Sequence, residues 1–196
     1  KLRFVSGINP QSFSMELTPE THFDTPEAVF SYSSKGYGGL SQQLHSFIRE
    51  HIVRGVWKRR PRPVLLNSWE ACYFKIDERK LLQLAKAGAD VGIELFVMDD
   101  GWFSGRNDDT SSLGDWEPDP KKLPGGIASL SKKIKALGVD FGLWVEPEMI
   151  SEDSDLYRAH PDWAFAVPGR VPNHGRNQLV LDMTRDDVRE YLLERL

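Results

Sequence analysis

Two adjacent carboxylates, Asp99 and Asp100, follow directly after the apolar run 93–98 and are followed by Gly101 and Trp102. A buried charge without a partner is costly, so two of them at one strand end need an explanation. A lone Asp at this position is as well explained by a turn or a helix N-cap. The pair beside a Trp favours a polyol site, because carboxylates accept hydrogen bonds from hydroxyls and aromatic faces stack on the C–H face of a pyranose.

The same types of residue recur at the ends of other apolar runs. Trp144 lies near the end of one run and Glu146 directly follows it, and Trp69 stands at the end of another. Each Trp is equally explained by packing, since Trp is frequently buried with its N–H satisfied. Arg176 lies just before a further run, as a surface cation or as a rigid fork that organises carboxylates.

Spacing alone also offers a catalytic interpretation. Glycoside hydrolysis requires two carboxyl groups, and Asp99 or Asp100 together with Glu146 would supply them.

Other chemistries find little support. The five His residues show no metal-ligand spacing, and the single cysteine, Cys72, is better explained by packing than by nucleophilic catalysis. With 25 basic and 29 acidic residues the net charge is −4, which gives no case for nucleic acid or an anionic membrane as partner. No apolar run approaches the roughly 20 residues of a membrane span. One cysteine suits a reducing compartment, so we expect a cytoplasmic location.

The elements that must position these residues alternate along the chain. Four short apolar runs (63–69, 93–98, 139–145 and 178–181) alternate with helical patterns, which predicts an α/β fold with a buried parallel sheet. A doubly wound sheet is the competitor, but no Gly-rich turn follows the first strand. Each run ends in Trp, Asp or Glu, as at the mouth of a (β/α)8 barrel. Thr184 with Asp187 three residues on predicts a capping box for the last helix.

The start of the chain differs in pattern. Residues 1–35 carry short apolar runs such as 3–5 and 28–32, broken by Gly and Pro, which indicates β structure. A helical stripe follows, and the basic, proline-bearing stretch 58–63 is the candidate boundary. The chain lacks an initiator Met and closes inside a helical pattern, so we expect a fragment.

Taken together, several segments resemble the family 36 glycoside hydrolases, which are bacterial α-galactosidases and raffinose-acting enzymes. The segments that carry the resemblance are Asn67–Ala71, Phe96–Phe103, Leu113–Trp116, Phe141–Met149, His160–Trp163 and Arg176–Asp182. The resemblance extends to residues 1–39, which look like the end of that family's N-terminal β-sandwich domain. It thus implies the sandwich tail over 1–39, a helical linker over 40–62, and the first four βα units of the catalytic TIM barrel over 63–196.

The resemblance also assigns roles. It implies that Asp99 and Asp100 bind galactose hydroxyls, that Trp144 and Arg176 line the same subsite, and that Trp69 forms a pocket wall. The family's nucleophile lies in a Lys-Trp-Asp motif, which is absent from residues 1–196, so no catalytic residue is expected in this chain and the chain alone is expected to be inactive.

The implied reaction is retaining hydrolysis of terminal α-galactosyl residues from melibiose- or raffinose-type oligosaccharides, with no cofactor and no metal. An oligomer, often a tetramer, is implied for the intact enzyme. Two alternatives stay open: a galactosyltransferase of the raffinose-oligosaccharide type, and a non-catalytic carbohydrate-binding module.

Overall fold

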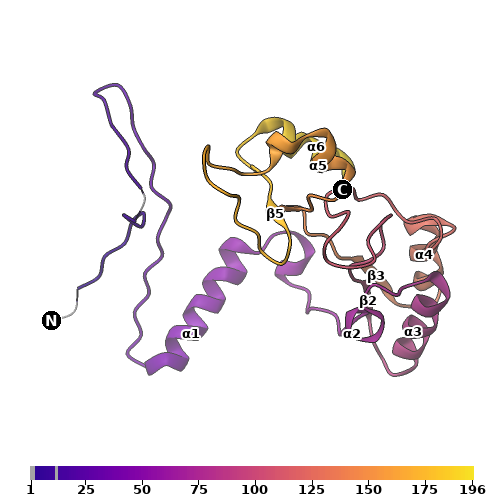
Figure 1. The fold of residues 1–196 in the computed structure, drawn as a ribbon. Coiled ribbons are helices and arrows are strands. Elements are labelled where there is room, and N and C mark those ends of the chain that lie inside the picture. The colour runs from indigo at the N-terminus through magenta and orange to yellow at the C-terminus, as the bar shows by residue number, and fades with distance from the viewer. Residues whose placement is uncertain (1–2, 12) are drawn as a thin grey trace. The chain divides into compact units, whose positions relative to one another are not determined.

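The computed structural model describes residues 3–11 and 13–196, and the chain divides into two units, 1–62 and 63–196. The helices and strands in chain order (Figure 1) are α1 (Gly36–Phe47), the π-helical η1 (Ile48–Ile52), the 3-10 turn η2 (Gly55–Lys58), β1 (Leu65–Asn67), α2 (Trp69–Cys72), α3 (Glu78–Asp90), β2 (Leu95–Met98), α4 (Gly126–Lys135), β3 (Asp140–Leu143), β4 (Met149–Ile150), α5 (Asp155–Ala159), the 3-10 turn η3 (Pro161–Trp163), β5 (Leu179–Val180) and α6 (Asp186–Arg195).

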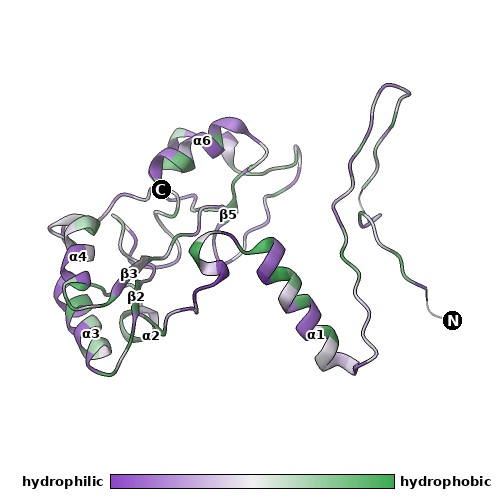
Figure 2. Cartoon of the chain, turned by 180° about the vertical axis from the view of Figure 1, so that it is seen from behind, coloured by the Kyte–Doolittle hydropathy of each residue, from purple (hydrophilic) through white to green (hydrophobic). Residues whose placement is uncertain are grey.

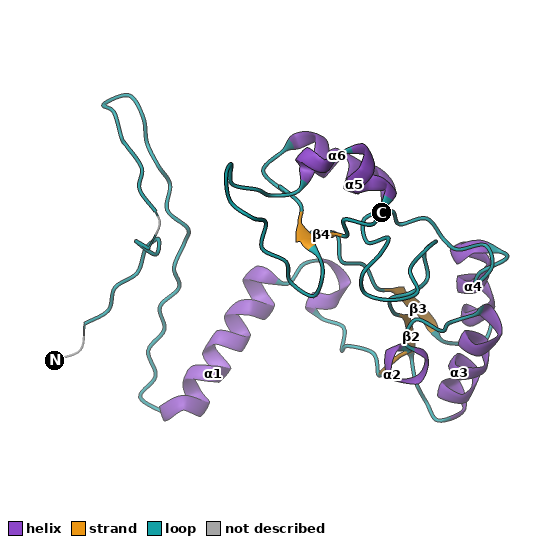
Figure 3. Cartoon of the chain, in the orientation of Figure 1, coloured by secondary structure: helices purple, strands orange, loops and turns teal. Residues whose placement is uncertain are grey.

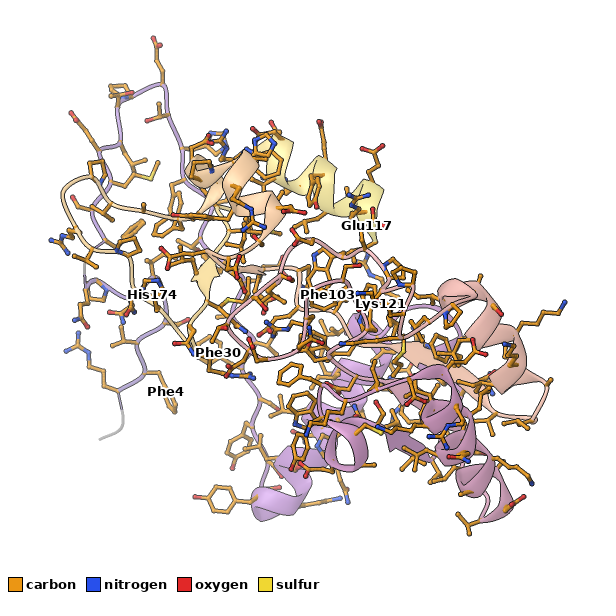
Figure 4. All side chains as sticks on the ribbon, turned by 45° about the vertical axis from the view of Figure 1, so that its right-hand side comes forward. Phe4, Phe30, Phe103, Glu117, Lys121 and His174 are labelled. Carbon is orange, nitrogen blue, oxygen red and sulfur yellow. The ribbon has the colours of Figure 1, made fainter. Side chains whose placement is uncertain are left out.

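The first unit is extended up to α1. Among residues 3–11 and 13–35 no strand is formed, so the short strands predicted at 3–5 and 28–32 are wrong for the described residues. A strand requires a hydrogen-bonded neighbour, and the apolar side chains of this segment stay exposed instead, as Phe4 and Phe30 do. The two rings still meet edge to face, with centroids 6.5 Å apart (Figure 4). The domain ranges 1–39 and 40–62 stay predictions.

The second unit is built on a three-stranded parallel sheet in the order β1-β2-β3. Figure 3 labels β2 and β3 of this sheet. Leu65 pairs with Leu95, and Leu95 pairs in turn with Asp140. The connections run through α3 and α4, whose apolar faces contribute Leu81, Ala85, Leu130 and Ile134 to the core (Figure 2). This confirms the predicted alternation of strands and helices over the first three apolar runs.

Local chemistry sets the ends of these helices. The Asp77 carboxylate accepts a hydrogen bond from the Lys80 amide at 2.8 Å and so caps the start of α3. Gly138 follows α4 with φ +81°, a left-handed conformation that glycine adopts without steric cost.

The predicted fourth barrel strand is wrong. Residues 179–180 form β5, which pairs antiparallel with β4 and lies outside the parallel sheet. Leu179 is 1% exposed, Val180 is 45% exposed and Leu181 is 2% exposed, which is the alternation of a sheet with one buried face. The described residues therefore hold three parallel strands of barrel type, and not the four that we predicted.

A second core accompanies this hairpin. It consists of buried apolar residues of the last third of the chain, separate from the core under the parallel sheet: Ile150, Leu156, Trp163, Ala164, Leu179, Leu181, Val188 and Leu192. The helix that closes it, α6, does not begin with the predicted capping box. The Thr184 hydroxyl donates to Asp182 instead, at 2.6 Å, and no side chain caps α6.

Candidate functional site

The first carboxylate of the site, Asp99, is held between two strand ends. Its Oδ2 accepts a hydrogen bond from Asn67 Nδ2 at 2.5 Å, and its amide donates to Ser68 Oγ at 3.0 Å. Asn67 also accepts the Trp69 amide on its Oδ1, at 2.7 Å. Because Asn67 ends β1 and Asp99 follows β2, the parallel register brings Asp99 and Trp69 to the same edge of the sheet.

The second carboxylate, Asp100, is 3% exposed and is paired with a buried guanidinium. Arg106 Nη2 lies 2.7 Å from Asp100 Oδ2, and Arg106 Nε lies 3.0 Å from Oδ1. The Gly101 amide donates to the same Oδ1 at 2.6 Å. Gly101 has φ +99°, and a Cβ there would lie 3.0 Å from the Phe74 backbone, so this tight turn requires glycine.

Lys122 holds the turn at Gly101 in place through hydrogen bonds to backbone carbonyls. Lys122 Nζ donates to the carbonyl oxygens of Gly101 at 2.7 Å, Arg106 at 2.8 Å and Phe74 at 3.4 Å. Partial burial lowers the pKa of Lys122, since removal from water disfavours the ammonium form. The three carbonyl dipoles compensate for part of that loss and fix the loop that follows Asp100.

Trp144 reaches the site from the third strand. Its amide donates to the Met98 carbonyl at 2.9 Å, which continues the pairing of β2 and β3 by one residue. Its own carbonyl accepts Trp102 Nε1 at 3.0 Å, and its ring centroid lies 6.3 Å from that of Trp116. Trp102 and Trp116 are buried, whereas Trp144 is half-buried and packs against the core. Partial exposure of the side chain is what stacking on a sugar requires.

Arg176 does not lie at the end of a parallel strand but at the tip of a two-residue turn. Gly175 and Gln178 exchange two backbone hydrogen bonds of 3.0 Å, and the residues between them, Arg176 and Asn177, have φ of +52° and +62°. Positive φ at both central residues is typical of a type I′ turn. Asn tolerates this conformation, but for Arg it is strained, as is frequent at functional sites.

Glu146, which follows the third strand, interacts electrostatically with Arg176. Burial raises the pKa of Glu146, and Glu148 raises it further, whereas the Arg176 charge lowers it. Asp100 also raises the Glu146 pKa to a smaller extent. No side-chain hydrogen bond or salt bridge joins Arg176 to Glu146 or Asp100 among the described residues, so only the effect of its charge on the Glu146 pKa links Arg176 to the strand ends.

The remaining candidate chemistries are less well supported by the geometry. Burial raises the pKa of the Cys72 thiol, so the thiolate needed for nucleophilic attack is disfavoured. Within residues 3–11 and 13–196 no group of three His, Cys, Asp or Glu side chains is arranged to hold a metal ion. Over the same residues, no helix is both long and apolar enough to cross a membrane.

The site and the fold now define a class of protein. The sequence model of the Melibiase family matches residues 22–196, so the chain belongs to this family. It is 50% identical over 192 residues to alpha-galactosidase AgaA of Geobacillus stearothermophilus, covering 98% of this chain and 26% of that protein. It is 48% identical to the bifunctional alpha-galactosidase/sucrose kinase AgaSK of Mediterraneibacter gnavus, covering 99% of this chain and 21% of that protein.

Solved structures agree with these relatives. The crystal structure of the GH36 alpha-galactosidase AgaA variant A355E D478A in complex with stachyose matches with a TM-score of 0.91 and 51% identity, covering 96% of this chain and 26% of that chain. The chain thus spans about a quarter of the length of AgaA. The resemblance to family 36 glycoside hydrolases is confirmed.

Several residues that build the site were missed by sequence reasoning. Asn67 was noted only as part of a motif, and Arg106 and Lys122 lie between the apolar runs 93–98 and 139–145, where no pattern singles them out. An isolated Arg six residues after an Asp pair is a weak signal, because most such residues are solvated surface charges. Only the structure shows that Arg106 is 0% exposed.

Proposed function

We propose that the full-length protein containing this chain is an α-galactosidase that releases terminal α-linked galactose from raffinose-type oligosaccharides, and that this chain supplies the grip on the galactosyl ring. The observation that carries the proposal is the pair of adjacent carboxylates, Asp99 and Asp100. Each is fixed by its own partner, Asn67 or Arg106, at the strand edge that also holds two half-buried Trp side chains.

In this proposal Asp99 and Asp100 accept hydrogen bonds from galactose hydroxyls. Trp144 stacks on the ring, Trp69 forms a wall of the pocket, and Arg176 approaches from the turn. Fixed acceptors of this kind orient the sugar without forming or breaking bonds. The nucleophile and the acid/base are expected outside residues 1–196, so Glu146 is not assigned to either role.

What is known of the relatives supports the substrate class. GH36 alpha-galactosidase AgaA has been crystallised with stachyose and, as another variant, with raffinose. We propose the same class of oligosaccharide for this protein. We further propose that the full-length protein is cytoplasmic and assembles into an oligomer, and that it requires no metal or organic cofactor.

Replacing Asp99 by Asn in the full-length protein tests the proposed role of Asp99 in galactose binding. A hydrogen bond to a charged group contributes about 1.5–3 kcal/mol, so we expect kcat/KM for a nitrophenyl α-galactoside to fall by roughly one to two powers of ten. The 196-residue chain alone should show no turnover. Hydrolysis by the isolated chain that disappears in Asp99→Asn would overturn the division of roles.

A further inference from the structure

Arg106 and Lys122 are not among the residues assigned to sugar binding, but they lie next to Asp100 and contact its carboxylate or the loop that follows it. We propose that Arg106 is a positioning residue, which fixes the Asp100 carboxylate so that one oxygen is aimed at a single galactose hydroxyl, and that Lys122 fixes Arg106 in turn. This inference rests on the proposed function and deepens it, because it locates part of the enzyme's selectivity in residues that do not touch the substrate.

The lone pairs of Asp100 are almost all occupied. Oδ1 accepts the Gly101 amide at 2.6 Å and Arg106 Nε at 3.0 Å, which fills both of its acceptor positions. Oδ2 accepts Arg106 Nη2 at 2.7 Å. Nε also lies 3.2 Å from Oδ2, but its single hydrogen is shared with Oδ1, where it is already counted. One acceptor position on Oδ2 is thus left, and its direction is set by the plane of the guanidinium.

The guanidinium cannot turn to follow a moving carboxylate, because its other contacts fix it. Nη1 donates to the Ser111 carbonyl at 2.9 Å. The rings of Phe74 and Phe103 lie on it with centroids 5.4 Å and 5.7 Å from Cζ, within the range of cation–π attraction. The side chain is 0% exposed, so water offers it no alternative partner.

Lys122 extends this restraint to the backbone. Its ammonium binds the carbonyls of Gly101 and Arg106, which are the two ends of the short loop between the carboxylate and its partner. Asp100, Arg106 and Lys122 therefore form one rigid unit. A buried ion pair contributes little net stability compared with an apolar replacement, so the benefit of this pair is the orientation of Asp100.

The substitution Arg106→Lys distinguishes the effect of the positive charge from the effect of the guanidinium geometry. Lysine keeps the charge but lacks the planar fork, so it can neutralise Asp100 without fixing the plane of the carboxylate. We expect Arg106→Lys to weaken discrimination between galactose and the sugar that lacks the recognised hydroxyl. A merely structural role would reduce activity by the same factor on every substrate.

The experiment compares three substrates on the full-length protein: nitrophenyl α-galactoside and its 4-deoxy and 6-deoxy analogues. In the wild type, at least one deoxy analogue should have a kcat/KM on the order of tenfold or more below that of the parent sugar. In Arg106→Lys this ratio should shrink by about tenfold for one analogue only. Lys122→Met should shift the same ratio in the same direction by a smaller factor.

Lys121→Met is the matched control, because Lys121 is exposed (labelled in Figure 4). Its backbone amide donates to Asp119, and among the described residues its ammonium group forms no hydrogen bond or salt bridge. Lys121→Met should leave all three rates unchanged. An equal loss on all three substrates in Arg106→Lys would contradict the inference. Should Arg106→Lys be recovered unfolded, the ratio in Lys122→Met decides, and an unchanged ratio there overturns it. A wild type that cleaves none of the three sugars would instead overturn the proposed function itself.

Discussion

The two cores of the second unit present their side chains to the proposed sugar site in opposite ways. At the edge of the parallel sheet, Asp99 and Asp100 directly follow a strand and are held by the half-buried Asn67 and the buried Arg106. The second core, packed around β4, β5 and α6, contributes Arg176 from an exposed and strained turn. In the proposed site, the rigid region would supply the selectivity for hydroxyls, and the hairpin would add a charge whose placement depends on its own packing.

The largest expected effect lies in the rigid region. Arg106→Met leaves Asp100 buried without its counter-ion, which should lower the free energy of unfolding by about 3–5 kcal/mol. Urea denaturation of the full-length protein, with hydrogen exchange of the amides of residues 99–106 as a local probe, measures it. Arg158→Met removes an exposed Arg that pairs with Asp153 and Asp155 in the other region, and should change stability little. Equal losses in the two variants would contradict the comparison.

A second prediction concerns the hairpin core. Leu179→Ala deletes a side chain that is 1% exposed, and should cost about 3 kcal/mol of local stability. Since Arg176 is carried by this hairpin, KM for a nitrophenyl α-galactoside should rise, while discrimination against its 4-deoxy and 6-deoxy analogues should stay as in the wild type. Loss of that discrimination would show that the two regions do not act separately.

A smaller effect is expected at the strained turn. Arg176→Gly relieves a left-handed conformation that costs a non-glycine residue about 1 kcal/mol, and the greater freedom of glycine in the unfolded chain offsets part of this gain. The turn should therefore gain roughly 0.5 kcal/mol while galactoside affinity falls. Asn177→Gly is the control, with a smaller gain and unchanged affinity. Thermal melts and KM values measure both, and unchanged affinity in Arg176→Gly would remove Arg176 from the site.

The smallest expected effect is a change of folding stability with pH, caused by titration of Glu146. Burial raises the pKa of Glu146 above its ordinary value of 4.5, so the folded protein binds this proton more tightly than the unfolded chain does. The associated stability is present below pH 4.5 and is lost as pH rises through the raised pKa. Glu146→Gln should therefore gain stability relative to the wild type as pH increases from 4.5 to 7. Parallel pH profiles for the two proteins would exclude this titration.

Much of the rigid region was predictable from sequence. The runs 63–69, 93–98 and 139–145 are mostly apolar, and such runs with intervening helical periods predict parallel strands whose ends converge. The Asp pair was recognisable because its two adjacent charges needed an explanation. Its partner Arg106 was not, because burial of a loop residue depends on contacts with Phe74 and Ser111 that no local pattern encodes.

The hairpin region was less predictable for a related reason. The run 178–181 is apolar enough for a barrel strand, and its length cannot distinguish a parallel partner from an antiparallel one. Pairing with β4 is decided by the second core, in which Leu179 meets Ile150 across the sheet. The positive φ of Arg176 was equally hidden, since only the following Asn177 favours such a turn.

The central claim is that this chain holds the galactosyl ring while the bond-breaking carboxylates lie outside residues 1–196. A fluorinated α-galactosyl fluoride that traps the glycosyl-enzyme, followed by mass mapping of the labelled peptide, tests it in the full-length protein. The account predicts a labelled peptide from outside these 196 residues, and slower labelling in Asp99→Asn. A covalent adduct on Asp99, Asp100 or Glu146 would contradict it.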